Sequence, residues 1–293
     1  MSLNFLRYKK IYFVFIGILS LASIASLAVF GLKPGIDFTG GSILELEYKA
    51  DRPSNQEIEE KLAGLDLGSL VLQPAGERGV IIRMKDIAEE AHQEIIQKLG
   101  KNDFEEKRFE AVGSVIGMEL KQKTITLILV SLFAVVFYIA LAFRKVQRPV
   151  QSWEYALASL VSLFHDILIP LGVFSVLGKF YGVEISIPVV TALLTVGGSS
   201  INNVIVVFDR IRENIMKRSG VTFEDTVNKS INETLGRCLN TSFCYLLPLL
   251  AIFFFGGITL KYFALALIVG ISAGTYSSVF LAGPLLTIFR RYA

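Results

Sequence analysis

An ionisable pair lies inside one of the long apolar stretches of this chain, and an arginine stands at the start of another. Asp166 follows His165 in the middle of the stretch from Tyr155 to Gly178, and Arg237 comes directly before the stretch from Cys238 to Ile258. A carboxyl group at the centre of a bilayer costs on the order of 3 kcal/mol unless it is protonated, paired or facing water. Asp166 is therefore a candidate for proton handling or gating, and the alternative is a purely structural hydrogen bond.

The apolar stretch from Ile185 to Phe208 carries a polar patch at its middle. Lipid cannot hydrogen-bond to amide side chains, so Asn202 and Asn203 must face protein, water or cargo. Neither can release a proton, which excludes both as acid–base relays. Four polar residues at four-residue intervals are expected to form an inward-facing stripe: Thr191, Thr195, Ser199 and Asn203. Such a stripe either hydrogen-bonds to neighbouring helices or lines a hydrated path. The full set of ion-pathway candidates is Asn203, Asn202, Arg237, Asp166 and Ser199.

The composition indicates a membrane protein. Of the 293 residues, 53% are hydrophobic and 19% are charged, and the mean hydropathy is +0.56. A soluble globule would typically carry about 25% charged residues. A helix needs roughly 20 apolar residues to cross a bilayer. Six stretches reach that length: Ile11–Phe30, Thr124–Phe143, Tyr155–Gly178, Ile185–Phe208, Cys238–Ile258 and Tyr262–Phe289.

Lysine and arginine predict the orientation of these spans, because cytoplasmic loops carry an excess of both. The short loops assigned to the outer side hold only Lys179 and Lys261. The inner side is assigned Arg7, Lys9, Lys10, Arg144, Lys145, Arg148, Arg210, Arg212, Lys217, Arg218, Lys229, Arg237, Arg290 and Arg291. Both termini are therefore expected in the cytoplasm. The first span is expected to be a retained anchor, since five further spans follow it.

The segment 32–123 is expected to form a small periplasmic domain between residues 1–31, with the first span, and residues 124–293, with the other five. Its apolar patterns alternate between strand and helix periods. The predicted order is strand, helix, strand, strand, helix, strand, over Ser42–Tyr48, Ser54–Leu65, Leu70–Gln73, Val80–Met84, Ile87–Leu99 and Phe104–Val112. This βαββαβ order is the ferredoxin-like arrangement, a sheet covered on one side by two helices. The predicted fold class is thus a six-helix membrane bundle with a small α+β domain.

Small residues are concentrated at the domain junctions and in the last span. Two glycine motifs flank the small domain and are interpreted as rigid hinges, with candidate positions Gly35, Asp37, Gly40, Gly41, Gly113 and Gly117. In the last span, small residues recur at every fourth position and predict close helix packing at Gly270, Gly274 and Ser278. Cys238 and Cys244 are six positions apart, which places them on different sides of a helix and predicts no disulfide.

The segment between the fourth and fifth spans is expected to hold an amphipathic helix. Asp209–Asn214 is interpreted as the cap of the fourth span. Thr222 and Asp225 then form a capping box, and the apolar residues that follow recur at four-residue spacing up to Arg237. We expect this helix, near residues 222–237, to lie along the inner membrane surface.

Missing motifs narrow the functional classes. The sequence contains no Walker loop, zinc-ligand spacing, nucleophile–base set or dinucleotide signature. The basic residues are spread among loops without aromatic interleaving, which is unlike a nucleic-acid surface. We therefore expect neither an enzyme nor a cofactor, and any work must draw on a transmembrane gradient or on a partner.

Five sequence motifs resemble the SecF family of bacterial protein-translocase subunits, in the resistance-nodulation-division superfamily. They are GIDFTGG at 35–41, VGSVIGMEL at 112–120, SINNVIVVFDRIREN at 200–214, VNKSINETLGR at 227–237 and GGITLKYFALALIVGISAGTYSSVFLAGP at 256–284. The resemblance implies six spans in the inner membrane, a periplasmic domain, and a complex with SecD, YajC and the SecYEG channel. It also implies late, gradient-driven translocation of an unfolded polypeptide, powered by protons or sodium ions.

The fourth span departs from the family pattern. Relatives typically carry an ionisable Asp where this chain has Asn203, so the nearby Arg237 is expected to face an amide. Two hypotheses follow. In one, coupling has moved to Asp166 or to acids of SecD, and Arg237 and Asn203 line the route. In the other, the chain is a non-transducing scaffold for SecD. A half-size exporter of small molecules from the same superfamily is a further alternative.

Overall fold

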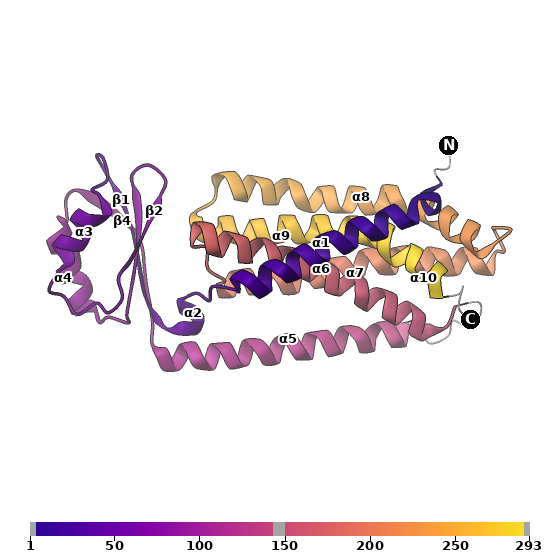
Figure 1. Ribbon diagram of the computed structural model, residues 1–293, viewed down its shortest axis with the longest axis horizontal. Helices are drawn as coiled ribbons and strands as arrows, with labels where there is room; N and C mark the ends of the chain where they lie inside the picture. Colours follow the sequence, from indigo (N-terminus) through magenta and orange to yellow (C-terminus); the bar gives the residue numbers. More distant parts are fainter. Residues whose placement is uncertain (1–3, 143–149, 290–293) are drawn as a thin grey trace. The chain divides into compact units, whose positions relative to one another are not determined.

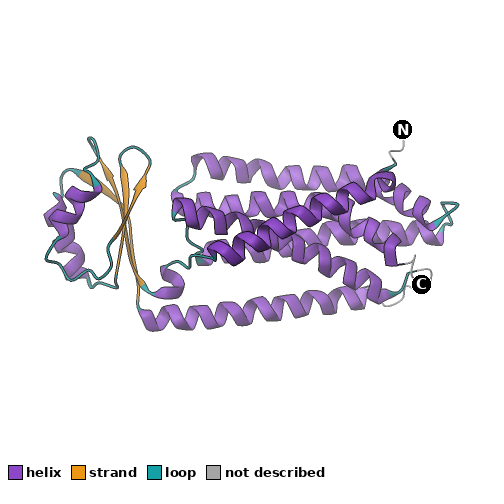
Figure 2. Cartoon of the chain, in the orientation of Figure 1, coloured by secondary structure: helices purple, strands orange, loops and turns teal. Residues whose placement is uncertain are grey.

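The computed structural model describes residues 4–142 and 150–289. The chain forms two compact units: Pro34–Leu127 is one, and the residues up to Lys33 together with those from Ile128 onward are the other. Figures 1 and 2 show a helical bundle and a small domain that contains all the described strands. Arg144, Lys145, Arg148, Arg290 and Arg291, used above to predict orientation, lie outside the described residues.

The described residues contain six helical segments long and apolar enough to cross a membrane, as predicted. Some of these segments join more than one helix. The elements of the bundle are η1 (Phe5–Tyr8), α1 (Lys9–Phe30), α6 (Ser152–Tyr181), α7 (Ile187–Met216), α8 (Phe223–Phe255), α9 (Ile258–Ser277), η2 (Ser278–Ala282) and α10 (Gly283–Phe289). Helix α5 (Ser114–Ala142) belongs to the small unit up to Leu127 and to the bundle from Ile128. η2 has π-helical geometry.

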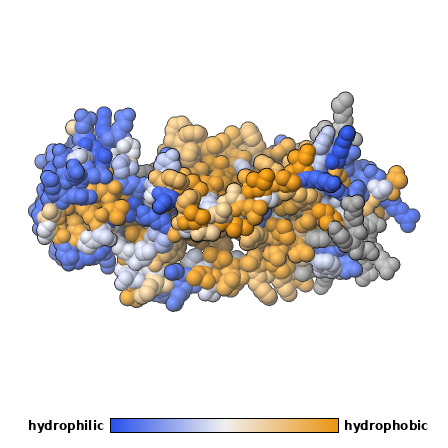
Figure 3. Space-filling view, in the orientation of Figure 1, coloured by the Kyte–Doolittle hydropathy of each residue, from blue (hydrophilic) through white to orange (hydrophobic). Residues whose placement is uncertain are grey.

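Helices α6, α7 and α9 pack on one another, and α1 and α8 pack against α6 and against α7 and α9, respectively. Tyr155, Phe174 and Phe208 are fully buried in the core, and the rings of Tyr155 and Phe208 meet with centroids 5.1 Å apart. α7 and α9 can approach closely because Gly270 has no side chain. A Cβ at this position would overlap Val196. Apolar side chains cover most of the bundle surface in Figure 3, and hydrophilic residues cover most of the small domain.

The small domain is a four-stranded antiparallel sheet in the order β2-β3-β1-β4. Figure 2 shows two helices on one side of this sheet. The elements are β1 (Gly41–Tyr48), α3 (Asn55–Leu62), β2 (Val71–Ala75), β3 (Gly79–Met84), α4 (Glu89–Leu99) and β4 (Phe104–Val112). Leu44, Leu46 and Ile82 from the sheet are fully buried with Ile58 and Ile95 from the helices. The predicted ferredoxin-like arrangement is confirmed.

The two glycine motifs meet inside the small domain. A four-residue helix, α2 (Ile36–Thr39), ends at Gly40, which has φ 74°, and Gly41 follows with φ 124°. Both values lie in a region that L side chains rarely adopt. A Cβ at Gly117, in the first turn of α5, would lie 2.8 Å from the Gly40 nitrogen. Gly113 lies just before α5, and its carbonyl accepts a hydrogen bond from the Gly117 amide. The second motif therefore provides the space that the first motif occupies.

The structure corrects two expectations about the segment from 209 to 237. Asp209–Asn214 is part of α7, which continues to Met216. The capping box between Thr222 and Asp225 is present, but α8 then runs without a break to Phe255. The predicted helix near residues 222–237 is therefore present but continuous with the fifth span, and its position at the inner membrane surface stays a prediction. A single Gly236 costs a helix only about 1 kcal/mol, which is too little to end it between two strongly helical segments.

Candidate functional site

Asp166 lies at the junction of three helices and is fully buried. Its Oδ2 accepts hydrogen bonds from Ser200 of α7 and from Ser277 of α9, the latter at 2.8 Å. Its Oδ1 is also buried, with no hydrogen-bond partner among the described residues. Ser162, one turn earlier on α6, donates to Ser277 at 3.0 Å. We call Asp166, Ser200 and Ser277 the Asp166 junction.

The neighbouring His165 belongs to a separate set of contacts. Its Nδ1 is 2.8 Å from the Ser20 hydroxyl of α1, and its Nε2 is 2.6 Å from the Tyr276 hydroxyl of α9. Successive residues on a helix point about 100° apart. α6 therefore uses two adjacent polar residues to reach different neighbours, and His165 is not the partner of Asp166.

The packing around the Asp166 junction is tight. A Cβ at Gly274 would lie 3.1 Å from the Ser200 Cβ and 3.4 Å from the Asp166 Oδ2. A larger residue at this position would require the neighbouring Ser200 to shift by a few tenths of an ångström.

Pro170 lies inside α6, four residues after Asp166. Because proline has no amide hydrogen, it removes the helical donor to the Asp166 carbonyl.

The polar residues of α7 do not all face inward, so that expectation is corrected. Thr191 and Thr195 are exposed and bond to carbonyls of their own helix, whereas Asn203 is buried. Residues four apart turn by about 40° per step on a helix with 3.6 residues per turn. Three such steps rotate the stripe by about 120°, from the outside of this chain to its interior. Ser199 lies between these extremes, half-buried.

Asn202 and Arg237 both lie on the exposed surface of the chain, on α7 and α8 respectively. Within the described part of the chain, no hydrogen bond joins Arg237 to Asn203. The structure thus separates the five ion-pathway candidates. Asp166 and Asn203 are inside the bundle, Ser199 is at its edge, and Asn202 and Arg237 are outside.

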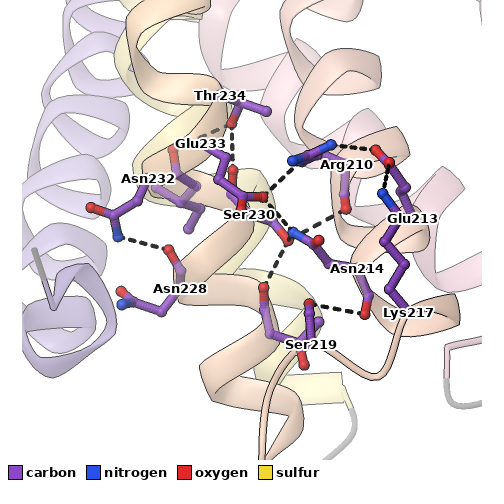
Figure 4. Close-up of polar contacts among 12 residues, drawn as sticks. Arg210, Glu213, Asn214, Lys217, Ser219, Asn228, Ser230, Asn232, Glu233 and Thr234 are labelled. Carbon is purple, nitrogen blue, oxygen red and sulfur yellow. Dashed lines mark hydrogen bonds and ion pairs between the residues drawn. The ribbon is translucent and has the colours of Figure 1, made fainter. Parts of the chain in front are cut away.

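A second polar cluster joins the end of α7 to the beginning of α8. The Asn214 amide donates to Ser230 at 2.9 Å and to Glu233 at 2.7 Å, and the Arg210 Nε donates to the same Glu233 oxygen at 2.7 Å. Figure 4 shows these side chains converging from the two helices. Arg210 and Lys217 also pair with Glu213. We call Arg210, Glu213, Asn214, Ser230 and Glu233 the α7–α8 clamp.

The N-terminal segment also binds α8 near this cluster. The Phe5 amide donates to the Asn228 side chain at 2.8 Å, and Lys9 forms an ion pair with Glu224 at 2.6 Å. Lys9 also reaches the Thr287 hydroxyl of α10 at 3.4 Å. This end of the bundle is therefore held together by charged and amide groups, whereas the Asp166 junction is held by neutral serine hydroxyl groups.

Sequence reasoning identified Asp166 but missed the residues that contact it. Ser200 and Ser277 are serines within small-residue segments, where packing explains them equally well. Their roles depend on which faces of α6, α7 and α9 meet, and helical periodicity within one segment does not supply that information. Among the described residues, no group of three or more His, Cys, Asp or Glu side chains could hold a metal ion.

Two family models match the chain. Residues 91–292 match the model described as protein export membrane protein SecD/SecF, C-terminal, and residues 25–51 match the model of the SecD/SecF GG motif. The chain belongs to the SecD/SecF family. The GG-motif match contains the Gly40–Gly41 turn described above, and the longer match contains both the Asp166 junction and the α7–α8 clamp.

Individual relatives agree with this assignment. The chain is 38% identical to the protein translocase subunit SecF of Thermobaculum terrenum, over 97% of this chain and 93% of that protein. It is 37% identical to SecF of Vibrio alginolyticus, over 97% and 89%. It is also 33% identical to the protein translocase subunit SecDF of Brucella abortus, over 97% of this chain and 38% of that protein.

A solved structure supports the same assignment. The crystal structure of SecDF from Thermus thermophilus, described as a translocon-associated membrane protein, matches with a TM-score of 0.84 and 32% identity. The match covers 99% of this chain, which spans only 39% of the SecDF chain. The fold, the multi-pass membrane location and the role as an accessory subunit of Sec protein export are thereby confirmed. The relatives are named as translocase subunits, which is a transport role.

Proposed function

We propose that this chain is one half of a two-half export device, and that its SecD partner binds along an outward polar face of α7. The observation that carries the proposal is the exposure of Thr191, Thr195, Gly198 and Asn202 within a membrane span. Their spacing of four, three and four residues places them on one face of the helix. Lipid cannot satisfy the Asn202 amide, so another protein surface is its natural environment.

The relatives support a SecD partner. SecDF of Brucella abortus and SecDF of Thermus thermophilus are both much longer than this chain, which matches 38% and 39% of them. We infer that SecD supplies the part of the same assembly that this chain does not match. The polar face of α7 is a surface at which two membrane halves can meet without exposing amides to lipid.

Within this assembly, the pair draws an unfolded polypeptide outward from the SecYEG channel, with YajC as a further component. A charge that crosses the membrane potential releases about 2.3 kcal/mol per 100 mV, which is enough to drive a conformational step. The proposed orientation places both termini in the cytoplasm and the small domain in the periplasm. The lysines and arginines of the loops support this orientation through the positive-inside rule.

Cysteine cross-linking tests the proposed partner surface. Cys238 and Cys244 are first replaced, and Asn202→Cys is then introduced into the full chain in membranes that contain SecD. We expect Asn202→Cys to cross-link to single cysteines placed along the SecD spans. Leu21→Cys is the matched control, because Leu21 is an exposed apolar residue of α1.

Each outcome decides a different part of the proposal. Cross-linking from Leu21→Cys but not from Asn202→Cys overturns the proposed surface and leaves the partner in place. If SecD does not copurify with the chain, and depletion of the chain does not slow late export, the proposed function itself fails.

A further inference from the structure

The Asp166 carboxyl group is bound asymmetrically. Ser200 and Ser277 both donate to Oδ2, whereas Oδ1 is buried without a partner in the described structure. An ionised carboxylate has two equivalent oxygens, each of which requires donors. A neutral carboxylic acid has one carbonyl oxygen, which accepts, and one hydroxyl oxygen, which carries a proton. On Oδ1, an O–H group would lack an acceptor just as a carboxylate oxygen would lack a donor, but an unpaired neutral hydroxyl costs far less to bury than an unpaired charge, so the arrangement around Asp166 favours the neutral acid.

Among the described residues, no charged side chain is recorded as acting on Asp166. The sequence of α7 from Ile187 to Phe208 contains no charged residue, and neither does the segment from Tyr262 to Phe289. The titratable neighbours are His165 on α6 and Tyr276 on α9, which bond to each other. From α1, Ser20 faces this pair. A buried carboxylate without a cation or further donors is very costly, and binding a proton removes that cost.

We propose that Asp166, Ser200 and Ser277 form a proton-binding site in which Asp166 is the only group that gains or loses the proton. This inference rests on the proposed function and names the ion for the gradient. The proton is taken from hydronium, an Oδ1–H bond forms, and water is released. A proton is favoured over sodium because the two serine hydroxyl groups already donate to the carboxyl group and are not free to coordinate a cation.

Loss of the proton has a structural consequence. The carboxylate then needs donors on both oxygens, but the two serine hydroxyls serve only Oδ2. At Gly274, α9 packs closely against Ser200 and the Asp166 carboxyl group, so further donors can reach the carboxylate more easily if this contact loosens. Deprotonation therefore favours separation of the helices and entry of water. The site has two states, closed with a neutral acid and open with a carboxylate, which gives the gradient a conformational output.

Infrared spectroscopy of the full chain with SecD in lipid bilayers tests this site. We expect the carbonyl band of a protonated carboxyl group, which Asp166→Asn removes. Ser277→Ala and Ser200→Ala each remove one hydrogen bond from the carbonyl oxygen, so each should shift the band to higher frequency. Raising the pH should abolish the band, and changing the sodium concentration at constant pH should leave it unchanged.

Glu154→Gln is the matched control, because Glu154 is another buried carboxyl group of α6 and lies outside the junction. Loss of the band in Glu154→Gln, or its persistence in Asp166→Asn, overturns the inference. Loss of the carbonyl band when sodium is added at constant pH also overturns the inference. The serine variants provide an answer even if Asp166→Asn does not fold, since an unshifted band in both excludes this site. Copurification with SecD is measured on the same samples, so failure of the proton site is distinguishable from failure of the proposed function.

Discussion

The Asp166 junction and the α7–α8 clamp both place polar groups between helices, but they balance charge differently. In the clamp, the Glu233 carboxylate receives the Arg210 guanidinium and the Asn214 amide. In the junction, Asp166 accepts hydrogen bonds only from two neutral serine hydroxyl groups, and one of its oxygens has no partner in the described residues. The clamp is satisfied as an ionised cluster, whereas the junction leaves one oxygen unpaired in either protonation state and therefore favours the neutral carboxyl group, which is less costly to bury.

This difference indicates which contacts between helices are fixed and which can separate. Satisfied, charge-assisted hydrogen bonds hold a fixed geometry, because moving either helix would leave charged groups unpaired. A carboxyl group whose burial is favoured in only one protonation state makes the contact between its helices conditional. We therefore expect α7 and α8 to move together near the clamp, and α7 and α9 to separate near Asp166.

The largest expected effect comes from Asp166→Asn. The amide cannot ionise, so the junction should remain in its closed state, and export should lose its response to the gradient. The measurement compares late export in energised and uncoupled membranes, in which this variant should behave as the uncoupled wild type. Asn203→Asp provides the contrast, because it adds a carboxyl group at the position that the family resemblance indicates for coupling. If Asp166→Asn retains full gradient dependence, the junction has no coupling role and the scaffold hypothesis gains support.

Asn214→Ala should destabilise the clamp. Asn214 is buried, and its loss leaves Ser230 and Glu233 without their amide donor, at a cost of about 1–3 kcal/mol. The measurement is the free energy of unfolding of the chain in detergent. Asn202→Ala changes an exposed amide of the same helix and should alter stability much less. Equal effects of the two substitutions would show that the clamp contributes little to stability.

Gly270→Ala should weaken the α7–α9 contact that closes the junction. The added methyl group would overlap Val196, and overpacking of this kind costs about 1–3 kcal/mol. Gly198→Ala is the matched control, since a Cβ at Gly198 meets nothing within 4 Å and alanine favours the helix by up to about 1 kcal/mol. The thermal unfolding temperature should therefore fall in Gly270→Ala and rise in Gly198→Ala. A stable Gly270→Ala would mean that α9 shifts easily away from α7.

The sequence was sufficient to predict the features that depend on local periodicity and length. The six spans, the βαββαβ order and the capping box at Thr222 follow from patterns within single segments. The misplaced features depend on long-range contacts. Thr191 and Asn203 belong to one apparent stripe, yet they face different environments because the rotation between them accumulates. Ser277 could not be assigned to Asp166, 111 positions away, until the packing of α6 and α9 was known.

A smaller effect is expected at Glu45, a half-buried carboxyl group on β1 of the small domain. Burial is the main cause that raises its pKa, and Arg108 acts in the opposite direction. Because the folded pKa exceeds the unfolded value, Glu45 stabilises the fold in acid, and this contribution is lost as the pH rises through the folded pKa. Glu45→Gln should therefore match the wild type in acid and be slightly more stable near neutral pH, by less than about 1 kcal/mol because the group is partly solvated.

Hydrogen exchange of the β1 amides in the full chain, compared between acidic and neutral pH, measures this effect on the small domain alone. Glu59→Gln on the exposed face of α3 is the control and should show no such pH dependence. Slower exchange in Glu45→Gln at neutral pH would support the argument, and faster exchange would contradict the assigned direction. The expected change is small because water reaches Glu45 in either protonation state. Asp166 has no such access while its junction is closed, so the same proton should have a much larger structural effect there.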